Sequence, residues 1–178
     1  MTTSLYEPDW HRIAREASAA GIVPASGDQP RIGLICIDMQ ESFCRPLPDR
    51  PRSEQLYVDG AEGDVQRTAQ WIYRHAERLT RIIVTLDTHS TFQIFSPFWW
   101  IDPAGRFAEP FTVITPDDVR AGRWRPNPAV AGPYVEWSLY YVERLAAGGK
   151  MALTLWPVHC LLGAAGHSLH PALNEAIL

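Results

Sequence analysis

Apolar and polar residues follow two kinds of pattern along this chain, and these patterns predict its strands and helices. Residues 32–38 and 81–87 are short runs rich in apolar and β-branched residues, as in strands inside a sheet. Residues 150–155 form a third run of this kind. Because residues 32–38 are almost continuously apolar, we expect this first strand to be covered on both faces.

Two longer segments have the spacing of amphipathic helices. Residues 64–79 carry apolar side chains four and three positions apart, which places them on one helix face: Val65, Ala69, Ile72, Ala76 and Leu79. Residues 133–147 begin at a Gly-Pro pair and end before a Gly-Gly pair, which are start and stop signals. Further helices are expected over about 9–20 and from near Ser168 to the C-terminus. The alternation predicts an α/β fold with a parallel sheet and helices on both of its faces.

The length of 178 residues suits one domain preceded by an extension. We assign residues 1–30 to an N-terminal helical extension and linker, and residues 31–178 to the domain. Residues 88–127 show little periodicity beyond a short helical turn around 116–121, and a loop of this length is typical of a lid or pocket wall. A plain insertion is the alternative. The tryptophans Trp99, Trp100 and Trp124 either line a pocket or pack this segment onto the body.

Composition narrows the class of protein. The net charge is −4 and no block of basic residues stands out, so we expect neither nucleic acid nor a membrane surface as partner. The N-terminus lacks the pattern of a secretory signal, and no apolar run is long enough to span a bilayer. With only three cysteines, free thiols in a reducing compartment are expected, which predicts a cytoplasmic protein.

Residues able to bind protons or metals gather where the three predicted strands end. Ligands of open parallel sheets bind at the carboxyl ends of the strands. Those ends deliver Asp38, Gln40 and Glu41 from the first strand, Asp87 and His89 from the second, and Trp156, His159 and Cys160 from the third.

A metal site is one reading of this convergence. Asp87 and His89 stand two residues apart just past a strand, and His159 is the natural third ligand. One carboxylate with two imidazoles suits a catalytic divalent ion such as Zn, Fe or Mn. The alternative is that each residue makes only local cap or loop hydrogen bonds.

Asp38 is flanked by two cysteines in the stretch CIDMQESFC. Its carboxylate is either a general base on a pocket floor or a cap for the next turn. Cys36, inside the strand, is expected in the core. Cys44 is expected in a loop, and Cys44 or Cys160 becomes reactive only where a cation or metal lowers the thiol pKa.

Three motifs together resemble the nicotinamidase/isochorismatase-like cysteine hydrolases. LICIDMQESF is similar to their Asp-Met-Gln-x-x-Phe segment, LDTHSTFQ to their Asp-Trp-His motif, and LWPVHC to their Trp-Pro-Pro-His-Cys segment. The motifs occur in the family's order within residues 31–173.

The resemblance implies a three-layer α/β/α sandwich with a parallel sheet and hydrolysis of an amide, as of nicotinamide to nicotinate and ammonia. In the domain at 31–178, Asp38 would be the acid that takes the proton from a cysteine nucleophile. Asp87, His89 and His159 would hold the divalent metal ion, and Phe43 and Trp156 would wall the substrate ring.

The chain also departs from this pattern. The family's catalytic lysine and nucleophilic cysteine follow the His-Cys segment, but here no lysine follows Lys150 and no cysteine follows Cys160. Gln93 stands where many relatives carry a further histidine. We therefore expect the N-terminal portion of such a hydrolase, incomplete at its C-terminus. It would carry the base and metal half of the site and be inactive alone.

Two alternatives belong to other functional classes. One is a non-catalytic metal-binding or interaction protein, and the other is a metallohydrolase that uses a metal-bound hydroxide. An incomplete sheet would also expose apolar surface, so we expect a homo-oligomer.

Overall fold

The computed structural model describes residues 9–49, 51, 55–149 and 151–178, which form two compact units. Of these residues, unit 1 comprises 9–47, 57–88 and 162–178, and unit 2 comprises 48–49, 51, 55–56, 89–149 and 151–161. Helices and strands occur in both units, which agrees with a mixed α/β class. No helix among the described residues is both long and apolar enough to cross a membrane.

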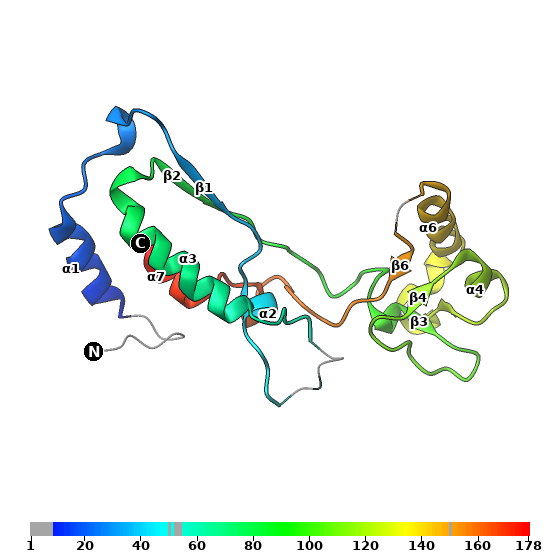
Figure 1. Cartoon of the computed structure of the whole chain (residues 1–178). Coiled ribbons are helices and arrows are strands. Elements are labelled where there is room, and N and C mark those ends of the chain that lie inside the picture. The colour runs from blue at the N-terminus through cyan, green and yellow to red at the C-terminus, as the bar shows by residue number, and fades with distance from the viewer. Residues whose placement is uncertain (1–8, 50, 52–54, 150) are drawn as a thin grey trace. The chain divides into compact units, whose positions relative to one another are not determined.

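A two-stranded parallel sheet lies in unit 1 (Figure 1). Strand β1 (Gly33–Cys36) pairs with β2 (Arg81–Val84), with Gly33 opposite Arg81 and Cys36 opposite Val84. Backbone hydrogen bonds continue past the strands, from Thr85 N to Cys36 O at 2.9 Å and from Asp38 N to Thr85 O at 3.3 Å. The two strands therefore deliver their next residues side by side at one end of the sheet.

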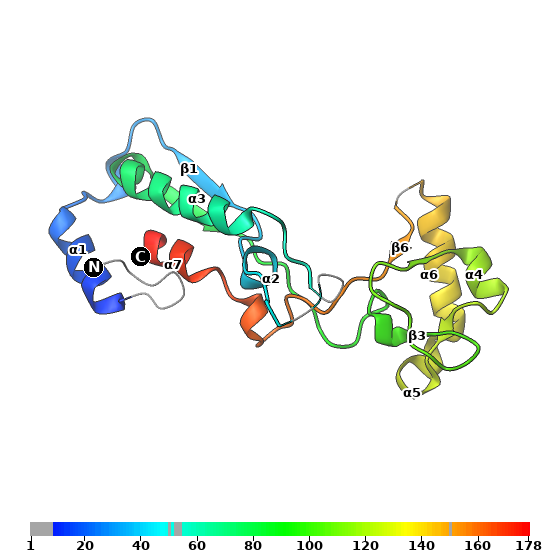
Figure 2. The ribbon, with the colours of Figure 1, turned by 60° about the horizontal axis from the view of Figure 1, so that its bottom comes forward.

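Helix α3 (Ala61–His75) covers one face of this sheet and packs against helix α7 (Pro171–Ile177) on its other side (Figure 2). The predicted face of α3 is confirmed, because Val65, Ala69 and Ile72 are buried. The helix begins at Ala61, three residues before the expected start, after Gly60 at a φ of 84°. It continues into a 3-10 turn, Ala76–Arg78.

The expectation that the first strand is covered on both faces is wrong. Leu34 is half-buried and Cys36 is buried toward the helices, but Ile35 and Ile37 are 59% and 69% exposed. Ile83 of β2 is 44% exposed as well. Alternate residues of a strand point to opposite faces, so a helix layer on one side leaves the other side apolar and open.

Two short helices complete unit 1. The expected N-terminal helix is α1 (Trp10–Ala20), capped by the Asp9 carboxylate, which accepts a hydrogen bond from Arg12 N. The Arg12 guanidinium also contacts the Glu175 carboxylate of α7 at 2.9 Å. Helix α2 (Glu41–Cys44) follows β1 directly.

Unit 2 has its own apolar core and two antiparallel strand pairs. Strand β3 (Trp100–Ile101) pairs with β5 (Arg125–Pro126), and β4 (Val113–Ile114) pairs with β6 (Leu153–Thr154). The helices are α4 (Pro116–Arg120), α5 (Pro128–Ala131) and α6 (Val135–Ala147). The core consists of Ile94, Trp99, Trp100, Ala108, Ile114, Ala131, Val142, Leu153 and Leu155.

The expected pairing of the third predicted strand is therefore wrong. It forms as β6, but it pairs antiparallel with β4 and does not extend the parallel sheet, so the described residues form no single parallel sheet in a three-layer sandwich. Residues 89–155 form a separate core around Trp99 and Trp100. Strand β6 pairs with β4 at the edge of this core. Lys150 lies outside the described residues.

The segment at 88–127 supplies most of this core, and its residues Gln93, Phe95 and Phe98 also form part of a pocket wall, as one of the two expectations had it. Trp99 and Trp100 are 3% and 0% exposed, and Trp124 packs partly buried against the same cluster. These tryptophans therefore pack within unit 2 itself, and Trp99 also lines a pocket of that unit.

Candidate metal centre

The chain that leaves β2 carries the first two candidate ligands, Asp87 and His89. The strand ends at Val84, earlier than the expected Asp87, so both residues lie on irregular backbone. Asp87 is held there by Gln40, which follows β1: Asp87 N donates to Gln40 Oε1 at 2.7 Å, and Gln40 Nε2 donates to Asp87 O at 2.9 Å.

His159 comes from the turn that follows β6. His159 is 8% exposed, and its ring Nδ1 lies 2.7 Å from the carbonyl oxygen of Pro157. A carbonyl accepts only, so Nδ1 carries the proton in this contact and Nε2 is the nitrogen with a lone pair in the neutral ring. The next residue, Cys160, has a φ of 46°, and its carbonyl accepts a hydrogen bond from His89 N at 2.9 Å.

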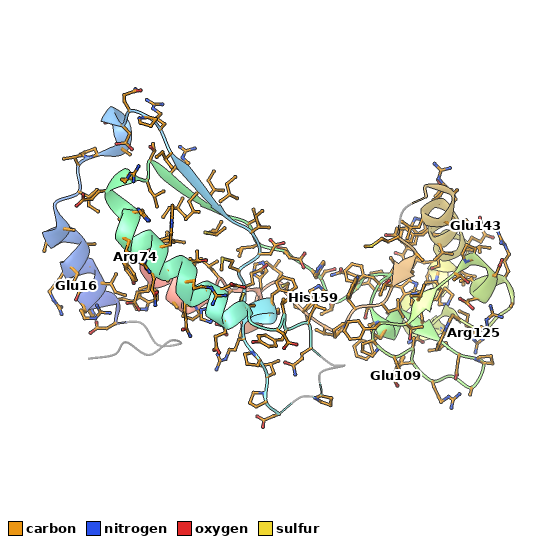
Figure 3. The ribbon with its side chains drawn as sticks, viewed as in Figure 1. Glu16, Arg74, Glu109, Arg125, Glu143 and His159 are labelled. Atoms are coloured by element: carbon orange, nitrogen blue, oxygen red, sulfur yellow. The ribbon has the colours of Figure 1, made fainter. Side chains whose placement is uncertain are left out.

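The two imidazoles of unit 2 lie against each other. The centroids of His89 and His159 are 4.6 Å apart with the rings at 69°, and Phe95 meets His89 edge-on at 4.9 Å. His159 is labelled in Figure 3. Asp87, the last but one residue of the 57–88 segment of unit 1, precedes His89 by two positions in the chain. Asp87 and His89 are half-buried and His159 is buried.

A cavity of about 200 Å³ opens beside the histidine pair within unit 2. Its wall is mostly apolar, and Phe95, Phe98 and Trp156 are its aromatic members. Trp156 is braced by Phe111, whose ring meets it edge-on at 5.9 Å. Gln93 also lines this cavity, and its side-chain amide donates to the carbonyl of Ser90.

Phe43, the second expected ring-wall residue, is part of unit 1. It belongs to α2 and packs, partly buried, against the core of unit 1. Among the aromatic residues that the resemblance nominated, only Trp156 lines the cavity beside the histidines.

Asp38 lies at the end of the parallel sheet, in unit 1. Its backbone has a φ of 52°, a conformation that non-glycine residues seldom adopt and that recurs at functional sites. Its Oδ1 accepts a 2.6 Å hydrogen bond from the Thr85 hydroxyl. The carboxylate is half-buried, as a proton acceptor on a pocket floor would be, but the same contacts also serve a structural cap.

The cysteines do not form a reactive thiol site. Cys36, Cys44 and Cys160 are all free and buried. Cys36 lies in the core, as expected, and burial raises its thiol pKa. Cys44 corrects the expectation of a loop residue, because it ends α2 and packs into the same core. Burial, with the charges of Glu41 and Asp64, raises its pKa to about 11, opposite to activation.

Sequence reasoning missed several partners of the candidate site. Gln40 was named only as a residue at the end of the first strand, and no local signal marks it as a partner of Asp87, 47 positions away. Thr85 gave no signal, because its role depends on a contact with Asp38, 47 positions away. The carbonyl of Pro157 is only two residues from His159, but a backbone carbonyl has no signature in the sequence. Phe95 was also missed, since an isolated aromatic residue in an aperiodic stretch is most often core.

Comparisons with known proteins find limited similarity. No protein-family model matches the chain, and no curated protein matches it. Among solved structures, the yeast nicotinamidase Pnc1p is similar at 21% identity with a TM-score of 0.47. The same enzyme bound to the inhibitor nicotinaldehyde is similar at 20% identity, also with a TM-score of 0.47. Each alignment covers 80% of this chain, which spans about half (50%) of the nicotinamidase chain.

Proposed function

We propose that this chain binds one divalent transition-metal ion through Asp87, His89 and His159. The observation that carries the proposal is the histidine pair of unit 2: two imidazoles whose centroids are 4.6 Å apart, with Asp87 two positions before His89 in the sequence. One carboxylate and two neutral imidazoles form a donor set that zinc, iron and manganese accept.

The orientation of His159 supports this assignment. Histidines that bind metals usually donate their second ring N–H to a carbonyl or carboxylate, which fixes the tautomer and the ring plane. The 2.7 Å contact between His159 Nδ1 and the Pro157 carbonyl has this form. The ring of Phe95 packs against the ring of His89 and restricts its rotation. A bound ion would supply Lewis acidity to a ligand atom placed in the adjoining cavity.

The substrate class that we propose is a small aromatic amide, of which nicotinamide is the example. The cavity beside the histidines has room for a single ring, and Phe95, Phe98 and Trp156 offer it aromatic faces. The motif resemblance points to the same class. Asp38 is the proposed general base of the complete site, whereas a substrate-binding role for Phe43 stays a prediction.

We further propose that the 178-residue chain alone does not hydrolyse amides by thiol chemistry. All three of its cysteines are buried, and none lines the cavity beside His89 and His159. The chain would supply the metal and base half of an amidase-type site. The same buried thiols also favour the second candidate, a metal-binding protein without catalysis.

Metal titration tests the proposal directly. Apo protein titrated with Zn²⁺, Co²⁺ or Mn²⁺ in a calorimeter should bind one ion per chain. The variants His89→Ala and His159→Ala should lose at least tenfold in affinity. His11→Ala is the matched control, because His11 is exposed on α1, and it should bind as the wild type does. Absence of stoichiometric binding, or equal affinity in all three variants, would refute the site.

Activity separates the two candidates. Ammonia release from nicotinamide by the metal-loaded chain should stay at the level of the protein-free control. If the ion is bound and aromatic amides protect the protein against thermal unfolding, the amidase half-site is supported. If the ion is bound and amides have no effect, the non-catalytic metal-binding protein is supported. Turnover above that control that is lost when all three cysteines are replaced would overturn the claim that the chain does not use thiol chemistry.

A further inference from the structure

Gln40 is a fully buried amide whose hydrogen bonds all go to chain segments around Asp87. The residue is 0% exposed and lies between the end of β1 and α2. Its Oε1 accepts from Asp87 N at 2.7 Å, and its Nε2 donates to Asp87 O at 2.9 Å and to His167 O at 2.8 Å. Both amide hydrogens and one carbonyl lone pair are therefore used.

The Gln40 side chain makes the two hydrogen bonds to the Asp87 backbone that a neighbouring strand would make in a sheet. β2 has ended at Val84, so the N–H and C=O of Asp87 have no neighbouring strand to bond. A side-chain amide matches the peptide group, so Gln40 binds Asp87 in two places and fixes both the position and the rotation of its backbone. Two bonds in one plane restrict the Asp87 Cα–Cβ direction far more than one would.

The segment at 167–170 holds Gln40 and the 87–88 segment from the other side. Glu41 N donates to Ser168 O at 2.9 Å, and Gln40 forms an isolated antiparallel bridge with Leu169. The hydroxyl of Thr88 lies 2.9 Å from His167 Nε2. Gln40 is thus anchored by its own backbone while its side chain holds Asp87.

We propose that Gln40 is a positioning residue for the metal site: it orients the Asp87 carboxylate by clamping the Asp87 backbone. The inference rests on the proposed metal-binding function and adds a residue that itself offers no donor to the ion. Removing a residue that hydrogen-bonds to a metal ligand, without binding the metal itself, typically lowers metal affinity by about 10- to 100-fold.

Two substitutions at Gln40 test the role. Gln40→Glu keeps the shape and can still accept from Asp87 N, but it cannot donate to the carbonyls of Asp87 and His167. Gln40→Leu removes all three bonds. Gln70→Glu and Gln70→Leu are the controls, because Gln70 is an exposed amide on α3 of the same unit. Full-length apo proteins are first compared by near-ultraviolet circular dichroism and thermal unfolding.

The decisive measurements are the Zn²⁺ affinity and the visible absorption spectrum of the Co²⁺ form, taken well below the unfolding temperature of each variant. We expect both Gln40 variants to bind Zn²⁺ about 10- to 100-fold more weakly and to show a shifted Co²⁺ spectrum. The Gln70 variants should match the wild type. Even where Gln40→Leu is too unstable to measure, Gln40→Glu keeps the test decisive.

Two failures are distinguishable. If the wild type binds Zn²⁺ and folded Gln40→Glu binds it within threefold with an unchanged Co²⁺ spectrum, the positioning role is overturned and the metal site stands. A lowered unfolding temperature with normal metal affinity would also overturn the positioning role, since it shows a purely structural one. If the wild type itself binds no ion, the proposed function fails and the inference falls with it.

Discussion

The hydroxyl of Thr85 donates a 2.6 Å hydrogen bond to Oδ1 of Asp38 and accepts one of 3.1 Å from the Asp38 backbone N–H. The two residues follow β2 and β1, and the parallel register places them side by side. One threonine side chain thus supports both the carboxylate and the positive φ of Asp38. The candidate base is held by the neighbouring strand.

Thr85→Val should therefore destabilise unit 1. The substitution keeps the β-branched shape but leaves the Asp38 carboxylate and N–H without this hydroxyl, at an expected cost of about 1 to 2 kcal/mol in the free energy of unfolding. Urea titration measures it. Thr154→Val, in strand β6, is the control and should change the free energy by less than half as much, because its one side-chain contact is a long 3.5 Å.

Cys44 should make the stability depend on alkaline pH. Burial raises its pKa from about 9 to about 11, so the folded state keeps a proton that the unfolded state releases above pH 9. This contribution is complete below pH 9 and is lost as the pH rises from about 9 to about 11. The measurement is the free energy of unfolding across that range.

In Cys44→Ala the decline over this range should be shallower than in the wild type. The constant loss from the smaller side chain cancels when slopes are compared. The thiols also give an independent check: a disulfide reagent at pH 8 should label the native chain slowly and all three cysteines after denaturation. Equal slopes together with rapid native labelling would contradict the buried assignment.

The buried hydrogen bond between Trp99 and Ser138 should stabilise the core of unit 2. Trp99 Nε1 donates to Ser138 Oγ at 3.0 Å, and Ser138 in turn donates to Tyr134 O at 2.6 Å. Ser138→Ala leaves the indole N–H buried without this acceptor, so the expected loss is about 1 to 3 kcal/mol. Urea unfolding followed by tryptophan fluorescence reports it. Ser90→Ala, at an exposed position, should lie within about 0.5 kcal/mol of the wild type.

The capping box of α4 should weaken in acid. Thr115 and Asp118 exchange hydrogen bonds at the start of the helix. Burial opposes ionisation of Asp118, but hydrogen bonds from Thr115 and Arg123 outweigh it and lower its pKa. Its contribution is therefore present above about pH 4 and is lost as the pH falls through the folded-state pKa.

Thr115→Ala should accordingly cost about 1 kcal/mol at pH 7 and less near pH 3. Unfolding measured at both pH values gives the difference. Thr112→Ala, a half-buried threonine outside the helix cap, is the control. A penalty that stays constant between the two pH values would exclude the ionised Asp118 from the box.

The open face of the parallel sheet should promote self-association. Ile35 and Ile83 are 59% and 44% exposed on that face. Replacing both with threonine preserves strand propensity and removes apolar surface, so association should fall. Sedimentation velocity over a wide concentration range measures it, with Val23→Thr, an exposed linker residue, as the control. A wild-type chain whose sedimentation does not change with concentration would refute this expectation.

Local features of the sequence predicted the helices well. The spacing of Val65, Ala69 and Ile72 marked the buried face of α3, and Asp9 caps a helix where one was expected. The turn expected around 116–121 forms as α4. Such features depend on the few residues within one or two helical turns, so a single sequence contains them.

The candidate site was predicted in part. The sequence nominated Asp87, His89 and His159 because strand ends and residue chemistry are both local properties. It could not nominate Gln40 as the clamp on Asp87, since that contact joins residues 47 positions apart. Nor could it separate Phe43, which packs in a core, from Trp156, which lines the cavity.

By itself, the sequence determined the longer helices and three of the strands, and which residues at the strand ends can bind protons or metals, but not the short strands β3, β4 and β5. Only the tertiary structure decided that β6 pairs with β4 rather than with the parallel sheet, and that Ile35 faces outward while Cys44 is buried. The physical reason is that strand pairing and burial depend on which distant segments supply a partner edge or an apolar face. Local periodicity records that a residue is apolar, but not which segment covers it.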